Sequence, residues 1–145
     1  MFASKLNSVL VPVDFSEQSL AAVDSALEIA KEPSGVFVLH VLGELSAAEP
    51  GMVWEAVDPE TRCRHAREAL QQQLSDAKYR NVHLDVMIGD PGHQIADEAH
   101  RVNADLIIMP SHGRRGLSRL LLGSVAERVL RLAKTNVLIL KEKAD

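Results

Sequence analysis

The sequence predicts an α/β fold: a doubly wound, five-stranded parallel sheet in the order 3-2-1-4-5, with helices on both faces. Short apolar runs alternate along the chain with segments of helical spacing. The runs are apolar throughout rather than at every second residue, as is typical of parallel strands buried on both faces. Right-handed crossovers between such strands leave few topologies, and 3-2-1-4-5 is the expected one.

Length and composition indicate one domain, residues 1–145, large enough to bury a core. A net charge of -4 predicts no general basic surface for nucleic acid. The single cysteine, Cys63, excludes an internal disulfide and favours a reducing compartment. No apolar run approaches the roughly 18 residues of a membrane span. The short apolar start of the chain lacks a small-residue cleavage site, so we expect a cytoplasmic protein.

The first half of the chain predicts two strands and a helix. The run Ser8–Val13 is the first strand, and Ser16 is expected to cap the helix that ends before Pro33. Val36–Leu42 is the second strand, in which His40 is interpreted as a core or rim histidine, with a ligand contact as the alternative. The apolar face of the helix is formed by Leu20, Val23, Leu27 and Ala30.

Residues 43–58 form an acidic segment with no clear period and no Lys or Arg. Loops of this length are often lids or interface segments. The apolar residues Met52, Val53 and Trp54 either pack on the core or contact another subunit, and the sequence leaves both open.

A second helix is expected from Glu60 to about Lys78, and Val82–Ile88 predicts the third strand. The turn that begins at Gly89 leads into a third helix, for which Pro91 is a suitable first residue. The buried face of the second helix is expected to comprise Cys63, Ala66, Leu70, Leu74 and Ala77, with Cys63 as a small core residue rather than a reactive thiol. The third helix is expected to bury Ile95, Ala99 and Val102.

The stretch Asp105–Lys134 is predicted to contain a strand, a loop and a helix that together form the binding site. A strand, Leu106–Met109, stops at Pro110, and a glycine-containing loop leads to a helix for which Ser124 and Glu127 form a capping box. The first amides of that helix, with Gly123 ahead of them, predict a phosphate-binding site. The alternative is a capped helix after a flexible loop. The loop also contains Gly113, Gly116, Arg114, Arg115 and Arg119, and the arginines are either phosphate contacts or solvated charges.

In a sheet of this order the switch point falls between strands one and four. Asp14 and the loop from Pro110 therefore lie side by side at the carboxyl ends, where such sheets bind ligands. Asp14 could alternatively cap or charge-match the first helix. Two independent arguments thus choose one place for an anionic ligand.

Several catalytic and metal motifs are missing. The sequence contains no GxxxxGK[ST], GxGxxG or GxSxG motif. Its six histidines and one cysteine have no short metal-ligand spacing, which argues against a structural zinc site. Ser111 and His112 are sequence neighbours, which does not make them a nucleophile and base. We predict no catalytic residues and no protein metal site.

The segment Ser111-His112-Gly113, nine residues, and Gly123-Ser124 resembles the ATP-binding members of the universal stress protein family, which have G-x2-G-x9-G-[S/T] here. The Val11–Asp14 start, the His40-Val41 strand end and the Gly89–Pro91 turn are similar too. The resemblance implies ATP or another adenine nucleotide across the switch point, with Mg bridging its phosphates. Asp14 would lie near the ribose and Val41 near the adenine. The implied nucleotide-binding residues are Pro12, Val13, Asp14, Val41, Met109, His112, Gly113, Arg115, Gly123, Ser124, Val125 and Ala126.

One position departs from that pattern. The first motif glycine is Pro110 here, and proline has no N–H to donate and a fixed φ of about -65°. The leading hypothesis is an ATP-binding stress-response sensor or regulator with little or no turnover. The alternative is a dimeric interaction module with a degenerate nucleotide site. An adenylyl-transferring ligase is a third possibility, which the lack of a HIGH-type or SGG-type loop after the first strand disfavours.

The closing strand, Asn136–Leu140, is an apolar edge strand of the predicted sheet. Single domains usually cover or pair such an edge. Members of the family commonly pair this strand across a two-fold axis, which implies a homodimer.

Overall fold

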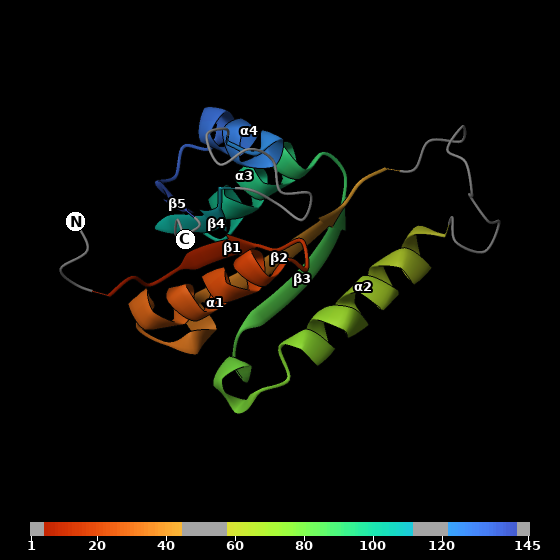
Figure 1. The fold of residues 1–145 in the computed structure, drawn as a ribbon, viewed down its shortest axis with the longest axis horizontal. Helices are drawn as coiled ribbons and strands as arrows, with labels where there is room; N and C mark the ends of the chain where they lie inside the picture. The colour runs from red at the N-terminus through yellow and green to blue at the C-terminus, as the bar shows by residue number, and fades with distance from the viewer. Residues whose placement is uncertain (1–4, 45–57, 112–121, 142–145) are drawn as a thin grey trace.

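The computed structural model describes residues 5–44, 58–111 and 122–141. Five parallel strands form one sheet in the order β3-β2-β1-β4-β5, which confirms the predicted fold and topology (Figure 1). The strands are β1 (Val9–Pro12), β2 (Val36–Leu42), β3 (His83–Ile88), β4 (Leu106–Pro110) and β5 (Val137–Leu140). The helices are α1 (Glu17–Ile29), α2 (Pro59–Gln73), α3 (Pro91–Arg101) and α4 (Ser124–Leu132), with short 3-10 turns η1 (Pro33–Gly35) and η3 (Ala77–Tyr79).

The helices cover the sheet in two layers. Helices α1 and α2 lie on one face and α3 and α4 on the other (Figure 1). Alternate residues of β1 point to opposite layers: Val9 and Val11 pack with the α1–α2 layer, and Leu10 packs with the α3–α4 layer. Burial on both sides explains why the central strands are apolar throughout.

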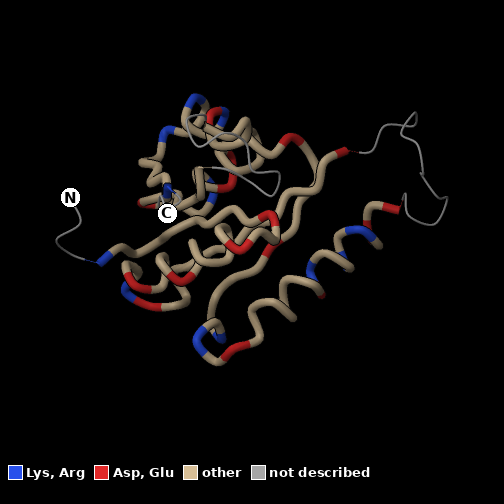
Figure 2. Tube along the Cα trace, in the orientation of Figure 1, with Lys and Arg blue, Asp and Glu red and all other residues tan. Residues whose placement is uncertain are grey.

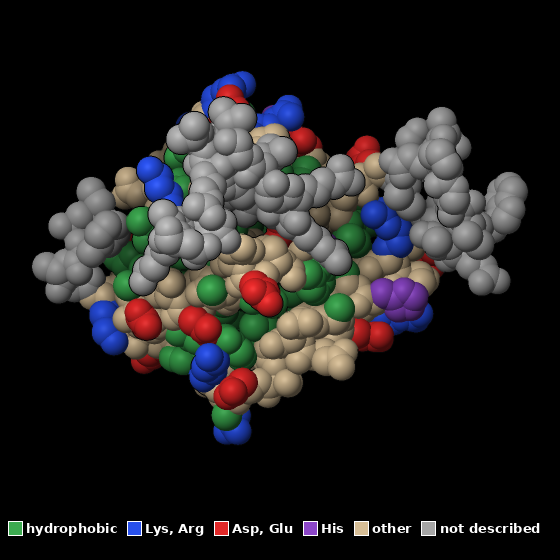
Figure 3. Space-filling model, viewed as in Figure 1, with side chains coloured by type: hydrophobic (Ala, Val, Ile, Leu, Met, Phe, Trp, Pro, Cys, Tyr) green, Lys and Arg blue, Asp and Glu red, His purple; other side chains and the backbone are tan. Residues whose placement is uncertain are grey.

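Charged residues occur along the helices and at the ends of the elements, while β1, β2 and β4 contain no Lys, Arg, Asp or Glu (Figure 2). On the face drawn in Figure 3, basic side chains are scattered among acidic ones. Within the described ranges, no helix has the length and hydropathy needed to span a bilayer.

The end of the second helix was predicted wrongly. The second helix was expected to reach Lys78 with Ala77 on its buried face, but α2 ends at Gln73 and Ala77 is exposed. The cause is Asp76, whose side chain accepts a hydrogen bond from the Lys78 amide and starts the separate turn η3. Leu74, just after α2, still packs in the core as predicted.

Candidate functional site

The candidate site lies where β1 and β4 end, at the switch point of the sheet. β1 has β2 on one side and β4 on the other, and the next described helices after β1 and β4, α1 and α4, lie on opposite faces of the sheet (Figure 1). Pro12 ends β1 and Pro110 ends β4. In sheets of this order ligands bind in the crevice outside the carboxyl ends of the strands at the switch point, so the candidate site is the crevice expected beside these two strand ends. This is the place that the sequence predicted.

Asp14 is fixed by hydrogen bonds within the turn after β1. Its carboxylate Oδ1 accepts from the Ser16 amide at 3.0 Å, and its own amide donates to the Ser19 hydroxyl at 3.2 Å. The N-cap of α1 is Ser16, whose hydroxyl accepts from the Ser19 amide at 3.1 Å, as predicted. Asp14 therefore shapes the turn without capping α1 itself, and its side chain is half-buried.

His40 supports the same turn from β2. Its Nδ1 lies 2.7 Å from the carbonyl oxygen of Val13. Its ring makes an edge-on contact with Phe15, with ring centroids 4.7 Å apart. Phe15 has a φ of 66°, in the left-handed region that bulky residues rarely adopt. The interpretation of His40 as a core or rim histidine is confirmed.

Ser111 and Gly123 bring the end of β4 and the start of α4 together. The Gly123 amide donates to the Ser111 carbonyl at 2.7 Å, and the Ser111 amide donates to Leu140 at 3.0 Å. Ser111 is buried. The start of α4 is thus held against the carboxyl end of the sheet, beside the crevice.

The predicted capping box is wrong. The N-cap of α4 is Gly123, with φ -62° and ψ 153°, and Ser124 is the first helical residue. The side chain of Glu127 accepts from Arg131 at 2.6 Å, one turn further along the helix. Because Glu127 pairs with Arg131 four residues later on the exposed face of the helix, its carboxylate does not reach back to the amides at the helix start.

The amides at the start of α4 are available to a ligand. The first helical hydrogen bond runs from the Glu127 amide to the Gly123 carbonyl at 2.9 Å, so the amides of Ser124, Val125 and Ala126 precede the helical pattern. Gly123 has no side chain and makes no side-chain cap. These amides carry the partial positive charge of the helix start.

Pro110 affects the same crevice. The amides of Ile107 and Ser111 both donate toward β5, at 2.9 and 3.0 Å. Backbone groups alternate along a strand, so the nitrogen of Pro110 faces the β1 side, where the crevice lies. Glycine at this position would present an N–H there, and proline does not.

The predicted nucleotide-binding residues fall into three groups. The side chains of Pro12, Val13, Met109 and Ala126 are buried in the core, and this leaves mainly their backbone groups for a ligand. Asp14, Val41 and Gly123 are half-buried, and Ser124 and Val125 are exposed. The remaining predicted contacts, His112, Gly113 and Arg115, lie outside the described residues, as do Arg114, Gly116 and Arg119.

Sequence reasoning missed Ser19. Its hydroxyl accepts a hydrogen bond from the Asp14 amide and donates one to the Ser16 carbonyl at 3.0 Å. The sequence did contain a signal for this role of Ser19. Asp14, Ser16 and Ser19 are spaced two and three residues apart, which suits side-chain hydrogen bonds to the backbone at a helix start.

A second polar group joins α3 to α4. Asp90, the N-cap of α3, accepts from the ring and the amide of His93 at 2.6 and 3.1 Å. These bonds, the ring bond first, hold the pKa of the Asp90 carboxyl below its usual value. Arg128 of α4 lies 3.6 Å from the same carboxylate. It packs over Gly92, where an added Cβ would lie only 2.9 Å from the Arg128 Cβ.

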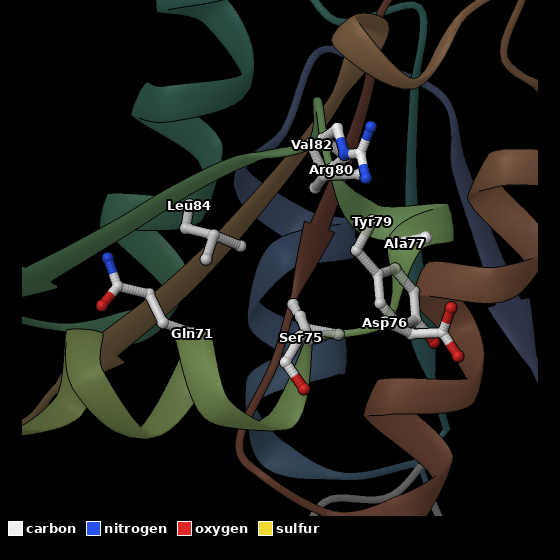
Figure 4. A pocket seen from close by; sticks show the side chains of 9 residues that line it. Gln71, Ser75, Asp76, Ala77, Tyr79, Arg80, Val82 and Leu84 are labelled. Carbon is white, nitrogen blue, oxygen red and sulfur yellow. The ribbon is translucent and has the colours of Figure 1, made fainter.

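A hollow of about 320 Å³ lies at the other end of the sheet (Figure 4). It is bordered by the end of α2, η3 and the start of β3, and is therefore remote from the carboxyl ends of the strands. Its lining residues are Gln71, Leu74, Ser75, Asp76, Ala77, Tyr79, Arg80, Val82 and Leu84. The switch point is therefore the candidate site, because strand ends and a helix start converge there. Among the described residues, no group of three or more His, Cys, Asp or Glu side chains is arranged to hold a metal ion.

Comparison with known proteins agrees with the fold of the chain. Residues 5–141 match the model of the universal stress protein family. The chain is 34% identical over 140 residues to the universal stress protein MJ0531 of Methanocaldococcus jannaschii, covering 92% of this chain and 81% of the relative. It is similar to the crystal structure of the protein PH0823, with 35% identity, a TM-score of 0.74 and coverage of 100% and 99% of the two chains. It is also similar to a universal stress protein solved in complex with cAMP, with 25% identity, a TM-score of 0.64 and coverage of 97% and 100%.

Proposed function

Because this chain belongs to the universal stress protein family, we propose that it binds an adenine nucleotide, ATP in the first instance, at the switch point. One observation carries the proposal: α4 begins at Gly123, which supplies no side-chain cap, and a helix start of this kind can bind a phosphate through its first amides. The cAMP complex of a similar protein supports an adenine nucleotide as the ligand class.

Each part of the nucleotide has a partner in this proposal. The half-buried Asp14 faces the ribose, and the end of β2 at Val41 meets the adenine. The amides of Ser124, Val125 and Ala126 receive phosphate oxygens. Mg would enter with the phosphates rather than through a cage of protein ligands, and would offset their negative charge, in keeping with its preference for retaining waters. Charge-assisted bonds from backbone amides to phosphate are among the stronger hydrogen bonds.

We propose a regulatory role with little or no turnover. The sequence has neither a P-loop motif nor a nucleophile elbow that would position a reacting group. The nucleotide then acts as the signal whose binding changes the protein. A cytoplasmic location is part of the proposal and is supported by the single cysteine, Cys63.

Two measurements test nucleotide binding. Mass spectrometry of small molecules released by heating the purified protein is expected to detect an adenine nucleotide. The melting temperature of ligand-free protein is expected to rise when Mg and ATP are added, because a ligand that binds only the folded state stabilises it. If no nucleotide is released and the melting temperature is unchanged at millimolar ATP, nucleotide binding is disproved.

Pro110 favours a second candidate, a dimeric module whose nucleotide site has degenerated. In this case the missing N–H on the β1 side of β4 abolishes a phosphate contact. The Pro110→Gly variant separates the two functions. A large gain in ATP affinity supports degeneration, whereas unchanged affinity supports a working site.

We further propose a homodimer through β5. This strand pairs only with β4 within the described sheet, and Leu138 is 37% exposed. An apolar edge strand is a template for pairing with a second chain. Size-exclusion chromatography with light scattering is expected to give a dimer at micromolar concentration, and a monomer alone would refute this arrangement.

A further inference from the structure

The peptide unit between Val13 and Asp14 is held at both ends. Its carbonyl oxygen lies 2.7 Å from His40 Nδ1, and its amide donates to the Ser19 hydroxyl at 3.2 Å. A trans peptide is planar, and its carbonyl and N–H point in opposite directions. Two bonds on opposite sides therefore fix the rotation of this unit. One bond comes from β2 and the other from α1.

This constraint acts where the backbone is strained. Phe15, the next residue, has a φ of 66°, a conformation that persists only where its surroundings impose it. Its ring packs edge-on against the same His40 ring. Asp14 lies between the fixed peptide and the strained residue, and one of its carboxylate oxygens takes the Ser16 amide at 3.0 Å. The direction of the Asp14 side chain thus depends on contacts that His40 makes.

The bond to Val13 also defines the tautomer of His40. A carbonyl oxygen only accepts hydrogen bonds, so Nδ1 must carry the hydrogen. In the neutral ring Nε2 is then without hydrogen. This state can be observed directly.

We propose that His40 is a positioning residue for the adenosine half of the nucleotide site. The inference rests on the proposed function. By holding the Val13 carbonyl, His40 keeps Asp14 in position for the ribose before the ligand arrives. The free-energy cost of ordering this turn therefore does not reduce the binding affinity. Loss of the hydrogen bond weakens binding of adenosine and of ATP by the same factor, because the phosphates lie at α4.

The variants His40→Leu and His40→Asn separate the hydrogen bond from the ring. Both remove the imidazole and its contact with Phe15, but the asparagine side chain keeps an N–H that reaches the Val13 carbonyl. Calorimetric titration with adenosine and with Mg·ATP is expected to show about 10-fold weaker binding of both ligands to His40→Leu, the effect of one hydrogen bond. His40→Asn is expected to recover most of that loss.

Nitrogen NMR of histidine-labelled protein reports which ring nitrogen of His40 carries the hydrogen. A side chain that serves only to pack would not require one particular tautomer. At a pH where the rings are neutral, wild type is expected to show an imidazole with hydrogen on Nδ1 that is missing from His40→Asn. A further signal of this kind is expected from His93, whose Nδ1 donates to Asp90, and it is expected to remain in the variant. If His40 instead carries its hydrogen on Nε2, the positioning role is overturned.

The outcomes distinguish this inference from the proposed function. If wild type binds neither ligand, both fail. If wild type binds and His40→Leu binds equally well, only the positioning role fails. The same holds if His40→Asn recovers nothing, since the ring rather than its N–H would then matter. Should His40→Leu not fold, Ser19→Ala decides, because it removes the bond at the other end of the peptide: weaker binding of both ligands supports the clamp, and unchanged binding overturns it.

Discussion

The starts of α1 and α4 border the same crevice but are built differently. At α1, the Ser16 hydroxyl accepts the Ser19 amide, and the side chain of Asp14 accepts the Ser16 amide. At α4, the N-cap is Gly123, which makes no side-chain cap of its own. Helices α2 and α3 resemble α1, because Asp58 and Asp90 cap them. A helix start without its own acceptor can take one from a ligand, and of the two helix starts at the switch point it is α4 whose N-cap residue supplies none.

The strongest way to break this difference is to give α4 a cap of its own. In Gly123→Asp, the carboxylate would accept the amides that we assign to phosphate and would repel a triphosphate. We expect ATP affinity to fall about 100-fold, or ~3 kcal/mol, with adenosine affinity little changed. The free energy of unfolding is expected to increase by a few tenths of a kcal/mol, because Asp is a better N-cap than Gly.

Gly123→Asn is the matched control for that variant. It has the same shape and can cap the helix, but it lacks the negative charge. Its loss of ATP affinity is expected to be smaller than that of Gly123→Asp. Full ATP affinity in the Asp variant would contradict a phosphate role for the start of α4.

A pair of serine variants sharpens the comparison through stability. Ser16→Ala removes the cap of α1 and is expected to lower the free energy of unfolding by about 1 kcal/mol. Ser124→Ala removes an exposed side chain from a position that does not cap, so the change is expected to stay within about 0.5 kcal/mol. Urea unfolding measures both. Equal losses would mean that Ser124 caps α4 after all.

The smallest expected effect concerns the charge on the α3 cap. Asp90→Asn keeps a capping side chain but removes the carboxylate whose pKa is held low by the His93 ring. A carboxyl with a lowered pKa in the folded state binds protons more tightly when unfolded, so its stabilising effect is complete above the ordinary pKa of 3.8. That effect disappears as the pH falls through the folded pKa. Wild type is thus expected to be the more stable protein at neutral pH, and the difference is expected to shrink as the pH falls below the ordinary pKa of 3.8. A difference that is constant with pH would exclude Asp90 as its source.

The sheet was predictable because burial on both faces leaves a clear trace in the sequence. The run Val36–Leu42 matches β2 at both ends, since every residue in it is compatible with a buried strand. The start of α1 was also predictable, because Ser16 is a good N-cap residue that comes just before the apolar residues with helical spacing. Helix ends were less predictable. From the sequence, Asp76 could lie within a longer α2 or start a new turn. Only the folded path of the chain decides that it starts the turn η3, so that α2 does not extend this far.

The start of α4 was misjudged because Gly123 and Ser124 are both acceptable N-caps. The choice depends on which residue has extended backbone angles, and the bond from Gly123 to Ser111 fixes that residue as the glycine. The support of Asp14 by His40 was not visible either, because the Val13 carbonyl and His40 are 27 residues apart and meet only when β1 pairs with β2. Contacts of this kind have no local signal in a sequence.

The most direct test follows the backbone amides of Ser124, Val125 and Ala126 by nitrogen–proton NMR during titration with Mg·ATP and, separately, with adenosine. These three resonances are predicted to move strongly with ATP and little with adenosine, while the Asp14 amide moves with both. Saturating ATP that shifts resonances elsewhere but leaves these three amides in place would contradict phosphate binding at the start of α4.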